Sequence, residues 1–283
     1  MFQTRHLSRE VFYIPKGESG TNRRKNELKT SVAAGIIIVI LAIAAIGGYY
    51  YSSMQKPPEK KILIVGTNTP FPPFEYVING TITGFDIDVI RALAQRAGYD
   101  NIEVKDMSFD SLITALQQGQ IDAIAAGMTI TSERLQQVNF TDPYWEADQS
   151  ILVREDSTFN PQGIVDLKGK IIGVQTGTTG EILANENNAT LRDIKHYDTF
   201  LLAVLDLTNG RIDAVVVDSP VAVAFTKQYP VRVASTVKTG EQWGFAVRKS
   251  DTELLTKLNS ALKDFKGSSE WDALIFKYWP VKE

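Results

Sequence analysis

The residue types that could do chemistry are concentrated in four loops, and each loop follows an apolar stretch of strand length. In open α/β sheets, ligands bind at the carboxyl ends of the strands. We therefore consider the four loops together as one candidate site. Its residues are Asn68 and Phe71 after the first stretch, Gly127, Thr129 and Arg134 after the second, Gln175, Thr178 and Thr179 after the third, and Asp218 after the fourth.

Two of these loops carry groups that suit an anion. Arg134 lies in the first turn of a helix that Thr131 or Ser132 can cap, where the helix dipole disfavours a cation and an anionic partner would be stabilising. Its planar guanidinium suits bidentate binding of a carboxylate. Residues 175–181 form a Gly/Thr-rich turn whose free N–H groups offer an anion site at the start of the next helix. Taken singly, each feature also fits a solvated arginine or a capped helix without a ligand.

The other two loops suit a cation and an apolar stem. Asp218 can accept hydrogen bonds from an ammonium group, or it can cap the helix that follows. Phe71 lies in a proline-rich loop where its ring can cover a ligand or join the core, as we expect for Phe74. Asn68 offers both donors and an acceptor, or it stabilises a turn. Together, the four loops describe the groups of an α-amino acid.

Composition excludes several other kinds of site. The 283 residues include no cysteine, so disulfides, thiolate metal sites, a cysteine nucleophile and a lipid-modified cysteine are excluded. Only two histidines are present, which leaves an imidazole-rich zinc site and most Ser-His-Asp schemes without their parts. The net charge of −3 gives no sign of a nucleic-acid partner. The sequence predicts neither a metal nor a cofactor.

An internal repeat organises the soluble part. Residues 109–127 and 200–218 each read as a helix that ends at a glycine, Gly119 or Gly210, followed by Ile-Asp-Ala and an apolar run. Each copy has an upstream strand that begins with Lys-Ile. Such apolar runs suit parallel strands with helices on both faces, so we expect two α/β lobes.

In the first copy, a helix lies between the paired strands. Gly84-Phe85-Asp86 precedes an apolar-periodic segment that Gly98 ends. We expect Asp86 to cap this helix, and Asp86 and Asp88 only to cap and solvate it.

The N-terminal region contains the clearest single feature, the uncharged run from Ser31 to Tyr51, about 31 Å long as a helix. Basic residues precede it, within a leader of residues 1–30, and tyrosines end it, which predicts a transmembrane anchor with the rest of the chain outside the cytoplasm. A cleaved signal peptide is the alternative, since small residues near Ala44 resemble a cleavage site. Residues 52–60, with Pro57-Pro58, are expected to form an extended linker.

Six ordered motifs between residues 61 and 279 closely resemble one family, the polar amino-acid-binding members of the periplasmic solute-binding proteins of ABC importers, which include glutamine- and lysine/arginine/ornithine-binding proteins. The motifs are TNTPFPPFEY, GFDIDVIRALA, AAGMTITSERLQQVNFTDPY, GVQTGTTGE, RIDAVVVDSP and GEQWGFAVRK. The resemblance implies a two-lobed type II periplasmic-binding-protein fold that closes by a hinge. Lobe one would be 61–146 plus 243–283 and lobe two 147–242, with hinges near 146–150 and 239–242.

The resemblance also implies a role for each site residue. Arg134 would clamp the ligand carboxylate, with help from Thr129 and the backbone N–H groups of Thr178 and Thr179. Asp218, with the carbonyl of Gly127 and the hydroxyl of Thr129, would take the α-ammonium. Phe71 and Phe109 would sandwich the aliphatic stem.

The side-chain end of the site departs from the family. Asn68 stands where the glutamine- and basic-amino-acid-binding relatives carry aspartate, and Gln175 and Val217 replace other polar choices. This favours a neutral polar ligand side chain. Glu75 could supply the missing negative charge, or it could be lobe scaffold.

The resemblance implies a monomeric, non-enzymatic receptor on the extracytoplasmic side that delivers a free amino acid to ABC permease subunits. Two alternatives stay open: an enzyme similar to the cyclohexadienyl dehydratases, which resemble these binding proteins, and a sensory ligand-binding module. No residue stands out as a general acid, and we expect no kinase or channel domain on the chain.

Overall fold

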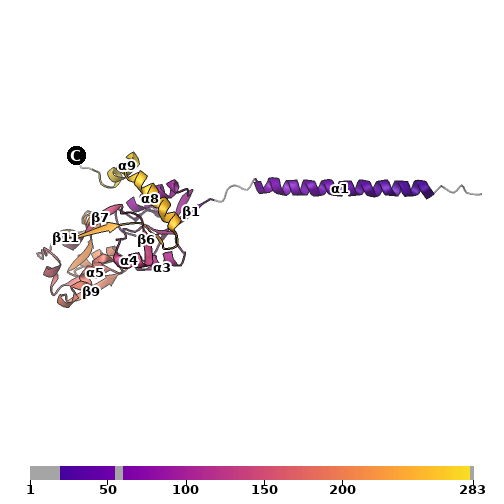
Figure 1. Cartoon of the computed structure of the whole chain (residues 1–283). Helices are drawn as coiled ribbons and strands as arrows, with labels where there is room; N and C mark the ends of the chain where they lie inside the picture. The colour runs from indigo at the N-terminus through magenta and orange to yellow at the C-terminus, as the bar shows by residue number, and fades with distance from the viewer. Residues whose placement is uncertain (1–19, 55–59, 281–283) are drawn as a thin grey trace, which may run out of the picture. The chain divides into compact units, whose positions relative to one another are not determined.

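The computed structural model describes residues 20–54 and 60–280, and these ranges fall into two separate units. The first unit contains one helix and the second contains the mixed α/β part (Figure 1). The basic residues before position 20 and the prolines of the linker lie outside the described residues.

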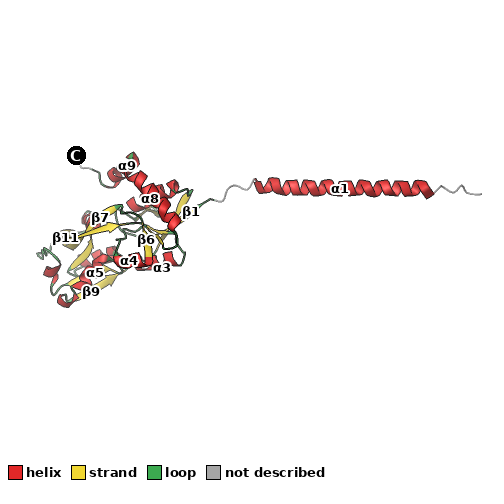
Figure 2. Ribbon diagram, in the orientation of Figure 1, coloured by secondary structure: helices red, strands yellow, loops and turns green. Residues whose placement is uncertain are grey.

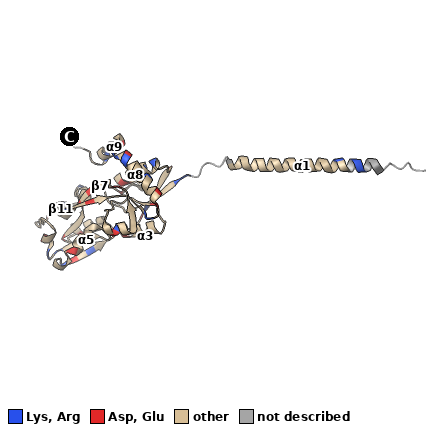
Figure 3. Cartoon of the chain, viewed as in Figure 1, with Lys and Arg blue, Asp and Glu red and all other residues tan. Residues whose placement is uncertain are grey.

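The first unit contains helix α1, Gly20–Met54. It begins eleven residues before the predicted span and ends three after it, because residues 20–30 are rich in good helix formers and no proline lies between Gly20 and Pro57. Ser52, Ser53 and Met54 are thus helical and do not belong to an extended linker. Residues 28–53 are long and apolar enough to cross a membrane, a test that a signal sequence also passes. Figure 3 shows basic residues only towards the N-terminal end of the helix.

The second unit contains two five-stranded sheets, with strands drawn yellow and helices red in Figure 2. The first sheet has the order β4-β1-β5-β12-β6, in which β4, β1 and β5 are parallel and β12 runs antiparallel to β5 and β6. The strands are β1 (Ile62–Thr67), β4 (Asn101–Asp106), β5 (Ala123–Ile124), β6 (Val138–Phe140) and β12 (Ala246–Arg248). A separate two-stranded hairpin follows β1 in the chain and is formed by β2 (Tyr76–Ile78) and β3 (Thr81–Thr83).

The second sheet has the order β11-β7-β10-β8-β9, in which β10, β8 and β9 are parallel. The long strands β7 and β11 pair antiparallel, and each is next in the chain to a strand of the first sheet, β7 after β6 and β11 before β12. The Gln242 carbonyl of β11 also accepts from the Ile130 N–H in the loop after β5. The strands are β7 (Trp145–Arg154), β8 (Ile171–Gln175), β9 (Asp193–Tyr197), β10 (Ala214–Asp218) and β11 (Val231–Trp243).

Helices cover both faces of each sheet, which explains the nearly continuous apolar strands. In the first sheet α2 and α8 supply one buried layer and α3 the other; in the second, α6 and α7 face one side and α5 the other. The helices are α2 (Phe85–Arg96), α3 (Leu112–Gln117), α4 (Ser132–Gln137), α5 (Thr179–Glu186), α6 (Phe200–Thr208), α7 (Ser219–Thr226), α8 (Thr252–Lys266) and α9 (Ser269–Tyr278), with short 3-10 turns at Phe109–Ser111, Ile164–Leu167 and Asn188–Thr190.

The two copies of the internal repeat have matching structures. Its predicted strands, β5 and β10, each lie parallel to their upstream partners β1 and β8. The helices before them stop ahead of Gly119 and Gly210, which have φ near +70° as a left-handed helix stop requires. β5 is shorter than its apolar run, because only Ala123 and Ile124 keep strand pairing.

The interpretation of Asp86 and Asp88 as capping, solvated residues is wrong. Gly84 is the N-cap residue of α2, and Asp86 is fully buried. Asp88 accepts from Lys277 (2.6 Å) and Tyr278 (2.7 Å) of α9. The Asp88 carboxylate therefore ties α2 to α9, whose bonding residues lie 189 and 190 positions away in the chain.

An aromatic cluster around Phe85 should dominate the stability of the second unit. Phe85 is fully buried against Trp145, Trp271 and Trp279. Phe85→Ala removes these contacts and leaves a cavity, so the free energy of unfolding should fall by about 3–5 kcal/mol. Denaturant unfolding of the full chain in detergent measures this loss.

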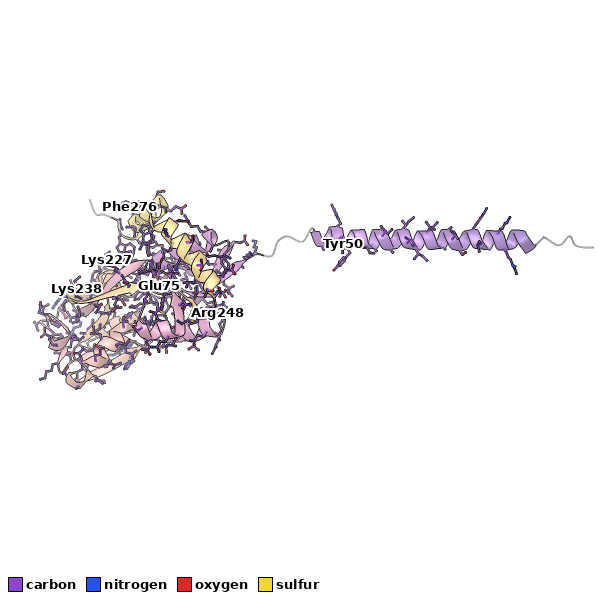
Figure 4. All side chains as sticks on the ribbon, in the orientation of Figure 1. Tyr50, Glu75, Lys227, Lys238, Arg248 and Phe276 are labelled. Carbon is purple, nitrogen blue, oxygen red and sulfur yellow. The ribbon has the colours of Figure 1, made fainter. Side chains whose placement is uncertain are left out.

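The matched control is Phe276→Ala on α9, whose ring is 64% exposed and lies at the margin of the second unit in Figure 4. It should change the free energy of unfolding by no more than about 0.5 kcal/mol. Equal losses in the two variants would contradict this account of the core.

Candidate binding cleft

One cavity in the second unit brings together every candidate residue from the sequence. Its walls come from the loops after β1, β5, β8 and β10, as the strand-end rule predicts. The lining residues are Asn68, Phe71, Glu75, Phe109, Ala126, Gly127, Thr129, Arg134, Gln175, Thr178, Thr179, Phe200 and Asp218. The binding role of each remains a prediction.

Arg134 is a buried cation that reaches across this cavity. Thr131 caps α4 by accepting from the Arg134 N–H (3.2 Å), which fixes the start of the helix. The guanidinium donates from Nη1 to the Thr129 carbonyl (2.8 Å) and from Nη2 to the Gly177 carbonyl (2.9 Å), and it lies over the Phe109 ring. Burial lowers the pKa of Arg134, and Asp218 and Glu241 oppose this change. Its bonds are to carbonyls, so a ligand carboxylate would be a stronger partner.

The Gly/Thr-rich turn lies opposite Arg134. Thr178 caps α5 by accepting from Glu181 N–H (3.2 Å), as the turn composition suggests. The Thr178 N–H makes only a long bond to the Gln175 carbonyl (3.4 Å). Gly177 adopts φ +80°, and its N–H donates to the Glu181 carboxylate (2.6 Å). The turn is therefore rigid and presents its carbonyl to Arg134.

Asp218 and Glu241 form an acidic pair near the start of α7. Gln149 donates from Nε2 to Asp218 Oδ1 (3.1 Å) and to Glu241 Oε1 (3.0 Å), so it lies between the two carboxylates. Asp218 makes no side-chain cap on α7, although it occupies the N-cap position. Burial, and then the charge of Glu241, raise the pKa of Asp218 to about 8, against the opposing effects of Arg134 and Gln149. Such a pair favours a cation between or beside its members.

Glu241 also accepts from two threonine hydroxyls, of which the family resemblance assigns the one on Thr129 to a ligand. Its Oε2 accepts from Thr129 (2.6 Å) and from Thr179 (2.7 Å). Thr129 follows β5 in the first sheet and Thr179 begins α5 on the second. A single carboxylate from β11 thus joins the two sides of the cavity.

The aromatic wall is built around Phe71. Its ring contacts Phe200 (centroids 5.8 Å apart) and Trp243 (5.7 Å). Gly127 has φ +53°, and a Cβ there would come within 2.5 Å of the Phe71 ring, so only glycine allows the close approach. Asp86 fixes this loop by accepting from the Gly127 N–H (2.9 Å).

Asp86 itself is held beneath the cavity. Tyr144 donates its hydroxyl to the same carboxylate oxygen (2.5 Å). Burial raises the pKa of Asp86 to about 6, although both hydrogen bonds lower it. The buried carboxylate thus orients the Gly127 loop at an energetic cost.

Two amides join the opposite sides at another point of the wall. Gln175 Nε2 donates to Asn68 Oδ1 (2.6 Å) and to the Asp198 carbonyl (2.8 Å). Asn68 Nδ2 donates to the Met107 carbonyl (2.8 Å). Both amides thus have hydrogen-bond partners within the protein.

The sequence reasoning missed several residues of this site. Phe200 opens the second repeat copy as Phe109 opens the first, so the internal symmetry was a usable signal for it. Glu241 lies in a motif that pointed to the family, but its place beside Asp218 follows only from the pairing of β11 with β7. No sequence pattern pointed to Gln149 or Ala126. Glu75 was expected to be either lobe scaffold or the source of a missing negative charge.

Comparison with known proteins identifies the family that this sequence matches. Residues 63–281 match the family described as bacterial extracellular solute-binding proteins, family 3. The arginine-binding extracellular protein ArtP of Bacillus subtilis is 36% identical over 227 residues, which cover 77% of this chain and 86% of ArtP.

Solved structures agree with this family. A structure of ArgBP from T. maritima is 45% identical, with a TM-score of 0.74 over 77% of this chain and 95% of that chain. The ancestral amino-acid-binding protein AncCDT-1, described as a precursor of cyclohexadienyl dehydratase, is 40% identical, with a TM-score of 0.72 over 77% and 95% of the two chains.

The buried Asp218 should make the ligand-free protein less stable as the pH rises. In the unfolded chain this carboxyl ionises near 3.8, whereas in the folded chain it ionises near 8, so stability is lost between about pH 4 and pH 8. Asp218→Asn keeps an acceptor for Gln149 and avoids the charge. The variant should therefore melt higher than the wild type at pH 8, with little difference near pH 4.

Thermal unfolding of the full chain without ligand at both pH values measures this effect. Asp142→Asn, at an exposed aspartate, should leave the melting temperature nearly unchanged at each pH. If Asp218→Asn lowers the melting temperature equally at both pH values, Asp218 carries no penalty for its charge.

Proposed function

Because this chain belongs to family 3 of the bacterial extracellular solute-binding proteins, we propose that its ligand is a basic amino acid, with arginine as the first candidate. Amino-acid binding for an ABC transporter is the shared role of its relatives and of this chain, and it takes place outside the cytoplasm. The single observation that carries the choice of ligand is the surplus of buried acid in the cleft.

The charges of the cleft argue for a cationic side chain. Glu75 and Asp218 line the cavity and Glu241 adjoins Asp218, whereas Arg134 is the cation among the lining residues. A neutral amino acid brings one positive and one negative charge, which leaves this surplus unchanged. A basic amino acid brings a second cation, and burying paired charges costs far less than burying unpaired ones. The neutral side chain expected from Asn68 is therefore not our proposal.

The names of the relatives support the same ligand. ArtP of Bacillus subtilis is an arginine-binding extracellular protein, and a second relative from Escherichia coli is an arginine-binding protein of an ABC transporter. Probable histidine-binding proteins are also among the relatives, so histidine is the second candidate to compare.

Capture requires the cleft to open and close again. The Arg134–Gly177 and Gln175–Asn68 bonds join the two sides directly, so an entering amino acid must replace them. Its α-carboxylate would take the two guanidinium N–H groups that now point at carbonyls. Its α-ammonium would lie by Asp218 and Glu241, and Phe71 and Phe109 would cover the stem. The bending would occur near residues 146–150 and 239–242, where β7 and β11 connect lobe one to lobe two.

The same cleft acts as a receptor and does not catalyse a reaction. The relatives named above are binding proteins, and AncCDT-1 is an amino-acid-binding protein although it preceded an enzyme. Incubation with prephenate and arogenate should yield no aromatic product. Product formation by the wild type that Arg134→Ala abolishes would favour the dehydratase alternative.

Helix α1 would keep the receptor on the membrane as a monomer beside the permease. The span at residues 28–53 fits an anchor, and the basic residues before it favour a cytoplasmic N-terminus.

The first prediction for this function concerns affinity. In calorimetry with the full chain in detergent, arginine should bind, and Arg134→Ala should weaken binding by at least about 30-fold, because a ligand carboxylate loses its buried partner. Arg91→Ala, on the solvent side of α2 with a salt bridge to Asp88, is the control and should bind as the wild type does. If the wild type, Arg134→Ala and Arg91→Ala bind arginine equally well, the binding site lies elsewhere. If the wild type binds none of the twenty amino acids, the proposed function is wrong.

The second prediction concerns the N-terminus. After expression in a bacterium, the mature protein should keep residues before position 28 and stay in the membrane fraction through alkaline carbonate washing. Removal of residues 1–55 and replacement by a cleavable signal should release it. A mature N-terminus just after the alanines near position 44 would favour the signal peptide instead.

A further inference from the structure

The carboxyl group of Glu75 is an unpaired acid in the wall of the cleft. The residue is 1% exposed and lines the cavity with Phe71 and Gly127. Its Oε2 is buried and has no hydrogen-bond partner. A buried carboxyl oxygen without a partner is costly, so it indicates a group that is satisfied in another state of the protein.

The backbone holds Glu75 firmly at this place. Phe71 and Glu75 exchange two hydrogen bonds, from Phe71 N–H to the Glu75 carbonyl (2.7 Å) and from Glu75 N–H to the Phe71 carbonyl (3.1 Å). Gly84 packs so closely against Phe74 and Glu75 that a Cβ there would collide with their backbone. The loop that presents the Phe71 ring therefore also presents Glu75.

The two amides of that wall bond to each other and to backbone carbonyls. Asn68 gives its amide to the Met107 carbonyl and its oxygen to Gln175, and Gln175 also bonds the Asp198 carbonyl. Glu75 is a carboxyl that both lines the cavity and has an oxygen without a partner, so it can accept from a ligand side chain.

The charges around Glu75 are all acidic. Asp86 on α2, Asp218 at the start of α7 and Asp106 at the end of β4 act on it, and Tyr144 lies near enough to be affected by it in turn. Burial, and then these three aspartates, raise the pKa of Glu75 well above its ordinary range. Arg134, by contrast, is influenced by Asp218, Glu241 and Glu133. Asp218 thus acts on both groups, whereas Asp86 and Asp106 act on Glu75 and not on Arg134.

We propose that Glu75 determines the specificity of the cleft by exchanging its own proton for the cationic end of the ligand side chain. This inference rests on the proposed function: it names the residue that recognises the ligand side chain and the proton that is released on binding. In the free protein, burial without a hydrogen-bond partner favours the neutral carboxyl. On binding, its O–H bond breaks, the proton leaves to the solvent buffer, and the carboxylate accepts N–H bonds from the ligand's guanidinium.

Calorimetry with L-arginine and L-citrulline tests the exchange. Citrulline keeps the shape of arginine but carries a neutral ureido group. Titrations of the full chain in detergent at pH 7, in phosphate and in Tris buffer, give the protons released from the dependence of the heat on the buffer. Asp218 can also release its proton to the buffer when it pairs with the α-ammonium, but it does so for both ligands. The wild type should release about one proton more with arginine than with citrulline.

Glu75→Gln should abolish this difference and weaken arginine binding by about 30-fold or more, while citrulline binds within a few-fold of the wild type. Glu103→Gln, at an exposed residue of β4, is the matched control and should behave as the wild type. The wild-type comparison of the two ligands needs no variant, so it decides the matter even if Glu75→Gln folds poorly.

Two results would overturn the inference, and they differ from failure of the proposed function. Equal proton release with both ligands, or arginine affinity retained in Glu75→Gln, would show that Glu75 is scaffold while arginine remains the ligand. If the wild type binds neither arginine nor any other basic amino acid, the proposed function fails and this inference fails with it.

Discussion

The structure depends on placing one guanidinium and several carboxylates together away from water. The guanidinium of the buried Arg134 has only carbonyls as direct hydrogen-bond partners. Glu75 and Asp218 line the same cavity, and Asp86 and Glu241 bond to residues of its wall. The buried charges among them lose their hydration there, which is favourable only when a partner replaces the water. A ligand that carries both a carboxylate and cations is such a partner, so binding and closure of the cleft become a single event.

The elements around the cavity hold these charged side chains in place. Caps at Thr131 and Thr178 fix the starts of two helices that face each other across the cavity, and Gly127 allows the Phe71 ring to pack against the backbone. The long pair of β7 and β11 carries Gln149 and Glu241 to the same point. A polar site of this kind is stable because rigid elements on every side restrict the side chains.

The buried acids also connect function to stability. Carboxyls whose pKa is raised in the folded chain favour the unfolded chain as the pH increases, and the penalty is removed only by protonation or by a cation. The ligand-free receptor therefore gives up stability for the ability to recognise its ligand. A membrane anchor at the other end of the chain would keep such a receptor near its permease without any demand on the cleft.

The sequence by itself determined much of this protein, because the relevant signals are local. Apolar runs, glycine stops at Gly119 and Gly210 and helix caps at Thr131 and Thr178 depend on neighbouring residues, so the α/β class and the repeat followed from them. The rule that sites lie at strand ends then grouped the loop residues correctly around one cavity, and family motifs supplied Phe109.

Only the tertiary structure decided how the charges are paired and which are buried. Asp86 reads as a helix cap in the sequence, yet it binds the Gly127 N–H and Tyr144. Glu241 joins Thr129 and Thr179 through a strand pairing between segments about ninety residues apart, and Glu75 becomes an acid without a partner only when Asp86 and Asp218 pack near it. Desolvation and long-range pairing are properties of the packed chain, so no local pattern could reveal them.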